Sequence, residues 1–247
     1  MARRRGVCPH CGRRLEPRKL IFKGIDAGFV GYENCGCEGA REAAAAALAE
    51  QRRESERRAL ESRLASYRKR GLPRRFVDSG VDATEPAERL AEGGSIYLYG
   101  DVGTGKTRLA TAAAQRWIDR SMGEVRFVEA ESLMTELRAC FASDGAVSEK
   151  SVRSKYQRTK ALFIDDLGKG KQSPYTVAKV LQIVNYRYNE MLPMFITAQI
   201  SLAQLESVFA KAANTADAEA IRSRLREMCI ELCLEGPDHR KLNAGRG

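Results

Sequence analysis

The stretch "GDVGTGKT" at residues 100–107 constrains the fold of this 247-residue chain more than any other. It fits the pattern G-x-x-x-x-G-K-[ST], follows the apolar run "SIYLY" and opens a segment that favours helix. In such a loop, backbone N–H groups surround phosphate oxygens, and the start of the helix adds a favourable dipole. We therefore expect a phosphate loop made by Gly100, Asp101, Val102, Gly103, Thr104, Gly105, Lys106 and Thr107. Lys106 is expected to reach the β- and γ-phosphates of ATP, and Thr107 to ligate Mg²⁺.

The run "LFIDD" supplies a second element of the same site. Its apolar residues indicate a buried strand, and Asp165 stands at the carboxyl end of that strand. Ligands of parallel sheets bind at this end of the strands. We expect Asp165 to hold Mg²⁺ and Asp166 to orient or deprotonate the attacking water.

Strand-like and helix-like segments alternate from about residue 74 onward. The expected strands are "SIYLY", "VRFVE", "ALFID", "MFIT" and "CIELCL". Helical segments separate them, one opened by Pro174 and one by a Ser-x-x-Gln capping box at Ser201. This order predicts an α/β fold with a five-stranded parallel sheet that helices cover on both faces.

Composition divides the chain into three expected regions. Residues 1–37 are rich in Cys, Gly and Arg, residues 38–73 favour a helical linker, and residues 74–247 carry the alternating pattern. The net charge is +10, and residues 1–75 account for it with 19 Lys and Arg against 9 Asp and Glu. This excess fits a solvated, charged helix or a region attracted to nucleic acid or an acidic partner, and the sequence leaves both open.

Four of the seven cysteines form two close pairs, Cys8 with Cys11 and Cys35 with Cys37. C-x-x-C and C-x-C are half-sites that together complete a tetrahedral zinc site. The intervening segment has few apolar residues, so we expect it to need Zn²⁺ in order to fold. Apolar patterns surround the remaining three cysteines, which are expected in the core: Cys140, Cys229 and Cys233.

No apolar run is long enough to span a bilayer, and none follows the basic start "MARRRG" as in a secretory signal. We therefore expect a cytoplasmic protein without membrane contact.

A further expectation concerns the segment "SEKSVRSKYQRTK", in which basic residues surround Tyr156. Such a segment can bind single-stranded DNA through phosphates and a stacked aromatic ring, or be a solvated helix face.

Five blocks of the sequence resemble the AAA+ ATPases, and within them the bacterial replicative helicase loaders of the DnaC/DnaI type. The resemblance covers most of residues 71–241. It rests on "GLPRRF", "GDVGTGKT", "LFIDDLG", "LPMFITAQISLAQLE" and "RSRLREMCIELCLEGPDHR".

The resemblance implies ATP binding, oligomerisation, contact with single-stranded DNA and an N-terminal zinc-bearing region that engages the replicative helicase. It places Gln199 at the polar sensor position, where the family usually has Asn. It also places Arg224 at the arginine-finger position, through which subunits would self-associate, and Arg240 at the second sensor position.

The favoured hypothesis is an ATPase of DNA replication that loads the replicative helicase onto single-stranded DNA and uses hydrolysis as a release switch. A transposition accessory ATPase of the IstB type shares the core and is one alternative. A small-molecule P-loop phosphotransferase is another, although no lid insertion is visible and His10 and His239 lie far from the motifs in sequence. A nucleotide-gated adaptor that does not hydrolyse ATP is the last.

Overall fold

The computed structural model describes residues 6–22, 25–140 and 148–239. The chain forms two compact units, Met1–Leu64 and Ala65–Gly247, and the boundary falls inside helix α1 (Glu38–Lys69). None of the described helices combines the length and apolar character needed to cross a bilayer.

The first unit contains an antiparallel hairpin and most of α1. Strand β1 (Pro17–Phe22) pairs with β2 (Ile25–Tyr32), and Lys19 lies opposite Phe29. The hairpin was not predicted, because Pro17 and the glycines of β2 weaken the strand pattern. In α1, Glu54 and Arg58 form an ion pair at 2.9 Å across one helical turn, on a helix that is polar all round.

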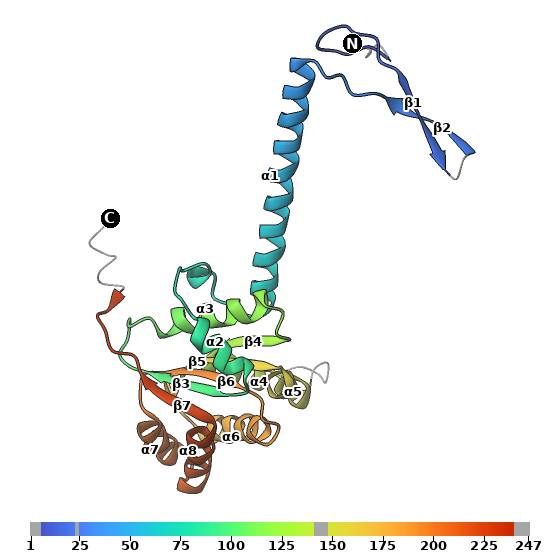
Figure 1. The fold of residues 1–247 in the computed structure, drawn as a ribbon. Helices are drawn as coiled ribbons and strands as arrows, with labels where there is room; N and C mark the ends of the chain where they lie inside the picture. Colours follow the sequence, from blue (N-terminus) through green and yellow to red (C-terminus); the bar gives the residue numbers. More distant parts are fainter. Residues whose placement is uncertain (1–5, 23–24, 141–147, 240–247) are drawn as a thin grey trace. The chain divides into compact units, whose positions relative to one another are not determined.

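The second unit is built on the predicted five-stranded parallel sheet. The strands are β3 (Ser95–Tyr99), β4 (Val125–Glu129), β5 (Ala161–Leu167), β6 (Met194–Ala198) and β7 (Cys229–Cys233). Their order is β4-β5-β6-β3-β7, so β3 lies between two strands that come later in the chain (Figure 1). Consequently, the loop after β3 lies at the same edge of the sheet as the ends of β5 and β6.

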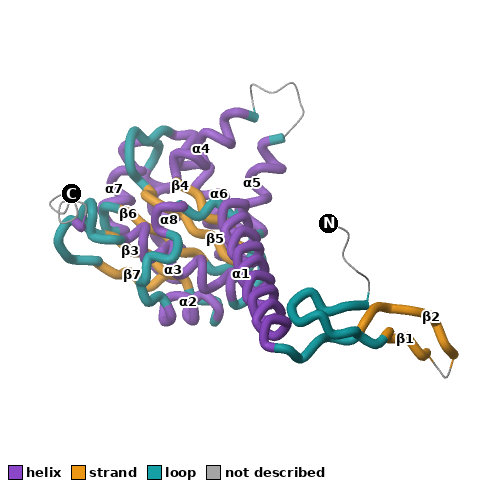
Figure 2. The backbone as a smooth tube through the Cα atoms, turned by 90° about the horizontal axis from the view of Figure 1, so that it is seen from above, coloured by secondary structure: helices purple, strands orange, loops and turns teal. Residues whose placement is uncertain are grey.

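Helices cover both faces of this sheet, as Figures 1 and 2 show. Helix α3 (Lys106–Asp119) lies on one face with α2 (Thr84–Ala91) packed against it, and a short 3₁₀ helix, η1 (Arg74–Phe76), contacts α3. The remaining helices are α4 (Ala130–Ala139), α5 (Glu149–Arg158), α6 (Pro174–Asn189), α7 (Leu202–Ala212) and α8 (Thr215–Met228). The predicted capping box of α7 is present, because Ser201 and Gln204 each bond the backbone of the other.

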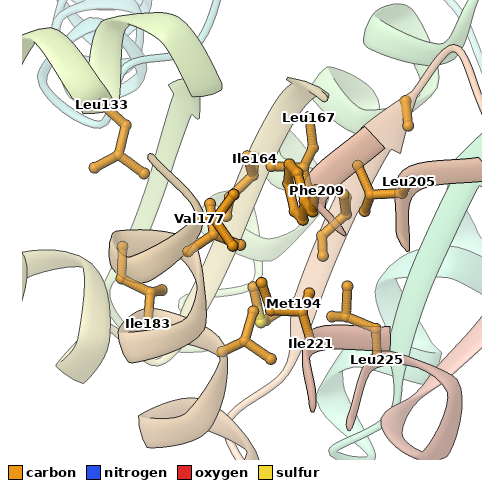
Figure 3. Close-up of a cluster of buried hydrophobic side chains, with 14 of the residues drawn as sticks. Leu133, Ile164, Leu167, Val177, Ile183, Met194, Leu205, Phe209, Ile221 and Leu225 are labelled. Carbon is orange, nitrogen blue, oxygen red and sulfur yellow. The ribbon is translucent and has the colours of Figure 1, made fainter. Parts of the chain in front are cut away.

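The main hydrophobic core fills the space between the sheet and helices α4, α6, α7 and α8. Figure 3 shows Leu133 of α4, Ile164 of β5, Phe209 of α7 and Ile221 of α8 converging there. Each of these side chains is at most 3% exposed. Burial of this apolar surface holds the helices against the strands and fixes the edge at which the loops meet.

The expectation that the three remaining cysteines are core residues needs correction. Cys229 packs against the core, and burial raises the pKa of its thiol to about 12. Cys233 is exposed, because β7 is an edge strand whose second half faces solvent. Cys140 is only half-buried, since it caps the C-terminus of α4 and donates its thiol to the Glu136 carbonyl.

Arg187 of α6 is fully buried and connects the ends of several elements. Its guanidinium group donates to five backbone carbonyl groups at 2.6–3.4 Å, those of Tyr156, Gln157, Thr159, Lys160 and Pro193. These carbonyls belong to the C-terminal end of α5 and to the connections that lead into β5 and β6. Arg187 therefore holds in place the segments from which two strands of the sheet begin.

Replacement of Arg187 by Met should lower the free energy of unfolding by about 3 kcal/mol or more, because several buried carbonyl groups would lose their donor. Urea denaturation of the purified chain measures this change. The matched control is Glu190→Gln, an exposed change one turn away that should cost no more than about 0.5 kcal/mol. A loss below about 1 kcal/mol for Arg187→Met would show that water replaces the guanidinium group.

Candidate nucleotide site and cysteine cluster

The phosphate loop, residues 100–107, connects buried strand β3 to the first turn of α3. Lys106 is 6% exposed, and its Nζ donates to the carbonyl oxygens of Gly100 at 2.8 Å and Asp101 at 2.6 Å. The ammonium group thus lies within the curve of the loop. Phosphate oxygens are charged and accept hydrogen bonds more strongly than carbonyl groups, so a bound triphosphate can displace these contacts.

Asp165 is the centre of a hydrogen-bond network at the end of β5. The Thr107 hydroxyl lies 3.0 Å from both carboxylate oxygens of Asp165. The Thr197 hydroxyl of β6 donates to Oδ1 of the same carboxylate and accepts the backbone N–H of Asp166 at 2.9 Å. The structure therefore brings the predicted Lys106, Thr107, Asp165 and Asp166 to one edge of the sheet.

Thr197 is a member of this site that sequence reasoning missed. It lies in the apolar run "MFITA", and its hydroxyl group was the one available signal. The side chain is fully buried, and its hydroxyl bridges the carboxylate of Asp165 and the backbone of Asp166. Thr197 thereby fixes the relative positions of the two acidic residues.

The surroundings of Asp165 suit a divalent cation. The residue is 8% exposed, and this burial raises the pKa of its carboxyl group, while hydrogen bonds from Thr197 and Thr107 partly offset the effect. A buried carboxylate with a neighbouring hydroxyl group offers the hard oxygen ligands that Mg²⁺ prefers. A cation at this point would also compensate the carboxylate charge that burial disfavours.

A pocket with a volume of about 540 Å³ opens beside the phosphate loop. Asp166, Lys169 and Gln199 line it, so the predicted sensor residue Gln199 does face the site. The lining also includes residues from segments that the sequence did not assign to the site: Arg75, Phe76, Ser79 and His239. The volume and the mixture of charged and aromatic walls suit a nucleotide.

The segment that follows β7 runs along the phosphate loop. The backbone N–H of His239 donates to the Gly103 carbonyl at 3.1 Å, and the Asp238 carboxylate lies so close to Gly103 that any Cβ there would collide with it. His239 reaches the pocket although it lies far from the motifs in sequence, because β7 pairs with β3, the strand that leads into the loop. Arg240 lies outside the described residues.

Arg224 of α8 does not line this pocket. Its guanidinium group donates to the Ala220 carbonyl at 2.9 Å and lies 5.9 Å from the centre of the Tyr188 ring. The neighbouring Arg222 forms an ion pair with Glu206 at 2.6 Å, whereas Arg226 is exposed. Arg224 thus lies outside the pocket of its own chain, and its action on another subunit stays a prediction.

The four N-terminal cysteines converge on one point. Their sulfur atoms all lie within 4.8 Å of one another, with Cys8 and Cys37 separated by 3.8 Å and Cys11 and Cys35 by 3.5 Å. Zinc–sulfur bonds of about 2.3 Å in a tetrahedron place sulfur atoms about 3.8 Å apart, so the cluster fits Zn²⁺. Backbone N–H groups of Cys11 and His10 lower the pKa of the Cys8 thiol to about 6. His10 supplies no ligand atom to the cluster.

The sequence leaves the segment around Tyr156 open between contact with DNA and a solvated helix face, and the structure excludes stacking of this ring on a base. Tyr156 is 2% exposed and donates its hydroxyl group to Glu136 at 2.6 Å. The ring lies on the inward face because α5 packs against α4 and α6, and it cannot stack on a base. The exposed basic residues of the segment remain a candidate surface: Lys150, Lys155, Arg158 and Lys160.

The strand order, the phosphate loop and the acidic strand end define an α/β nucleotide-binding core of the AAA+ class. Residues 58–245 match the family described as IstB-like ATP binding protein, and the chain therefore belongs to this family. Membership indicates nucleotide binding. A search of curated proteins found no significant match.

Solved structures show the same fold. The crystal structure of DnaI is 26% identical, with a TM-score of 0.55, over 69% of this chain and 95% of that chain. A putative primosome component from Streptococcus pyogenes serotype M3 is 22% identical, with a TM-score of 0.52, over 69% and 93%. The replication initiator DnaA bound to AMPPCP and single-stranded DNA is 20% identical, with a TM-score of 0.51, over 63% of this chain. The matched region spans only 44% of that DnaA chain.

The cysteine cluster leads to a prediction of about one zinc ion per chain in protein purified without chelator. Cys35→Ser should release the metal and reduce hydrogen-exchange protection in the β1–β2 hairpin, because the hairpin lies between the two ligand pairs. ATP binding should remain nearly unchanged, since the pocket belongs to the other unit. Metal analysis by mass spectrometry provides the measurement.

The exposed Cys233, which lies outside the cluster, is the control: Cys233→Ser should keep the metal. Wild-type protein that carries no zinc under these conditions would contradict the prediction.

Proposed function

We propose that this protein is an ATPase of DNA replication that binds the replicative helicase and loads it onto single-stranded DNA. The pocket lined by Lys106, Thr107 and Asp166, with Asp165 hydrogen-bonded to Thr107, carries the proposal. The core is similar to nearly the whole DnaI chain. The ATP-bound protein would bind helicase and DNA, and ATP hydrolysis would release them. Residues 1–37 would form the zinc-bearing region, residues 38–73 the helical linker and residues 74–247 the ATPase core.

In this proposal, Lys106 exchanges its loop carbonyls for the β- and γ-phosphates of ATP, and Phe76 contacts the base or the sugar. Thr107 and Asp165 hold Mg²⁺, which supplies charge neutralisation on the phosphates. Asp166 orients a water molecule and accepts its proton as the water oxygen bonds to the γ-phosphorus. The bond to the bridging oxygen breaks, ADP leaves with the electron pair, and the proton passes to solvent. Gln199 senses the γ-phosphate, as its place in the pocket permits.

Two surfaces are proposed for the macromolecular partners. The zinc-bearing region engages the helicase, since it lies outside the ATPase core and exposes apolar side chains on the hairpin, among them Ile21 at 69% and Phe29 at 59%. Single-stranded DNA contacts the exposed basic residues of α5 or the basic N-terminal third. Either contact would weaken steeply with salt, because binding releases counterions from the phosphates.

The test is recovery of the replicative helicase from the source cell, with and without ATP. Full-length protein should recover it in a nucleotide-dependent way, and a truncated chain of residues 65–247 should lose it. This truncation keeps the buried Tyr67 and Leu72, which pack into the second unit, so that ATP binding serves as the folding control. If residues 65–247 recover as much helicase as the full chain, the N-terminal unit is not the docking site.

A second candidate function is that of a transposition accessory ATPase of the IstB type. The family to which residues 58–245 belong favours it. The two candidates share the ATPase core and differ in the partner. Recovery of a transposase in place of a helicase would decide for the second candidate. Recovery of neither, together with turnover of a small-molecule acceptor, would favour a phosphotransferase.

The role of Arg224 leads to a prediction about mixed assemblies. Arg224→Ala should bind ATP almost normally yet hydrolyse it poorly, because an arginine supplied by a neighbouring subunit stabilises charge on the transferring phosphoryl group by about a thousandfold in rate. Lys106→Ala should bind ATP weakly and be inactive. A mixture should regain activity, since the Arg224→Ala subunit keeps an intact phosphate loop that its Lys106→Ala neighbour can complement. Steady-state ATPase assays in the presence of single-stranded DNA measure this rescue.

The matched control is Arg226→Ala, an exposed arginine on the same helix, which should retain wild-type hydrolysis. If light scattering shows that the two inactive variants co-assemble and the mixture still stays inactive, Arg224 does not act on a neighbouring subunit.

A further inference from the structure

Lys169 is a charged residue of the nucleotide pocket that the mechanism above does not use. Its Nζ lies 2.7 Å from Oδ2 of Asp166, the carboxylate proposed to orient the attacking water. The hydrogen bond and the charge of Asp166 raise the pKa of Lys169, so that the ammonium group stays protonated. One oxygen of the acidic residue is therefore occupied by a cation of its own chain.

The backbone fixes this contact. Asp166 has a positive φ of 56°, and its carbonyl accepts the backbone N–H of Lys169 at 3.2 Å in a tight turn. The turn passes through Gly168, whose φ is 82° and where a Cβ would lie 2.6 Å from a methyl group of Leu205. Because Thr197 also holds the backbone N–H of Asp166, the carboxylate and the ammonium group face each other across a short, constrained segment.

A second carboxylate lies within reach of the same ammonium group. Oε1 of Glu129 is 4.0 Å from Nζ of Lys169. Glu129 ends β4 and is the register partner of Asp165 in the neighbouring strand, so the sheet holds it beside the site. Lys169 is half-exposed and its side chain is flexible, so the ammonium group has room to turn toward either carboxylate.

We propose that Lys169 is a positioning residue for Asp166. Paired with Asp166, it occupies one of the two carboxylate oxygens, leaves fewer arrangements in which the carboxylate can orient the attacking water, and so makes hydrolysis slow. Moved onto Glu129, it leaves both oxygens of Asp166 available and hydrolysis proceeds. This inference rests on the proposed ATPase function. The movement of Lys169 from Asp166 to Glu129 is the step at which a partner would accelerate hydrolysis and thereby the release of helicase and DNA.

The test compares ATP turnover and ATP affinity in full-length variants. Lys169→Met keeps most of the side-chain volume and removes the charge, so kcat should rise about two- to fivefold, the range that a half-exposed ion pair allows. The Kd of a fluorescent ATP analogue should change less than about twofold, in line with the small contribution of an exposed charge. Lys171→Met, an exposed lysine of the same connection outside the pocket, is the matched control and should leave both quantities unchanged.

A second pair of variants separates positioning from a structural role. Glu129→Gln should lower kcat, because Lys169 loses its alternative ionic partner and spends more time on Asp166. In the Lys169→Met background, Glu129→Gln should have no effect on kcat, since no ammonium group remains to be shared. A merely structural role of either residue would give independent effects in the double variant.

Three results would overturn the inference. The first is a kcat of Lys169→Met at or below the wild-type value, and the second is an effect of Glu129→Gln that persists without Lys169. The third is the absence of turnover in both wild type and Lys169→Met, which means that the ion pair does not limit hydrolysis. In that case, if the wild type still binds the ATP analogue and recovers helicase, the proposed loading function is retained and only this inference fails. If the wild type does not bind ATP, the proposed function itself is wrong.

Discussion

The buried carboxylate of Asp165 is the point on which the nucleotide site depends. It receives hydrogen bonds from Thr107 of α3 and from Thr197 of β6, while it belongs itself to β5. Three elements that are distant in sequence are thereby tied at one edge of the sheet. Without these hydroxyl groups, a carboxylate at this depth would be buried without partners, which is unfavourable. The same network that makes its burial tolerable also aligns the phosphate loop with the acidic strand end.

The strand order makes this arrangement possible. Because β3 lies between β6 and β7, its loop meets the end of β6 on one side and the segment after β7 on the other. Gly103 tolerates the close approach of Asp238, and His239 enters the pocket as a result. At the opposite edge of the sheet, Arg187 secures the connections into β5 and β6 through backbone carbonyl groups. The strand order therefore brings the residues of the site together at the carboxyl ends of the strands, and Arg187 stabilises the connections at the opposite ends.

Arg224 lies apart from the other residues that the sequence assigns to the site. Lys106, Asp166 and Gln199 line the pocket of their own chain and Asp165 bonds Thr107 beside it, whereas Arg224 lies against Tyr188 on the α6–α8 layer. Lys106 is paired with the loop and Asp166 with Lys169, so these charges of the pocket have partners within their own chain. Under the proposed function, this pairing would be a resting state that a neighbouring subunit or a partner relieves.

Local patterns of apolar, glycine and ligand residues were enough to predict the five strands of the sheet, the helices between them, the phosphate loop and the cysteine pairs, but not helix α2. Tertiary contacts alone place Lys169 and His239 in the pocket, join Thr197 to Asp165 and turn the Tyr156 ring inward. A polar residue in an apolar strand, a lysine in a turn and a histidine near the end of the chain carry no periodic signal. Their partners are set by strand order and by the face on which a helix packs, and both depend on contacts between residues that are far apart in sequence.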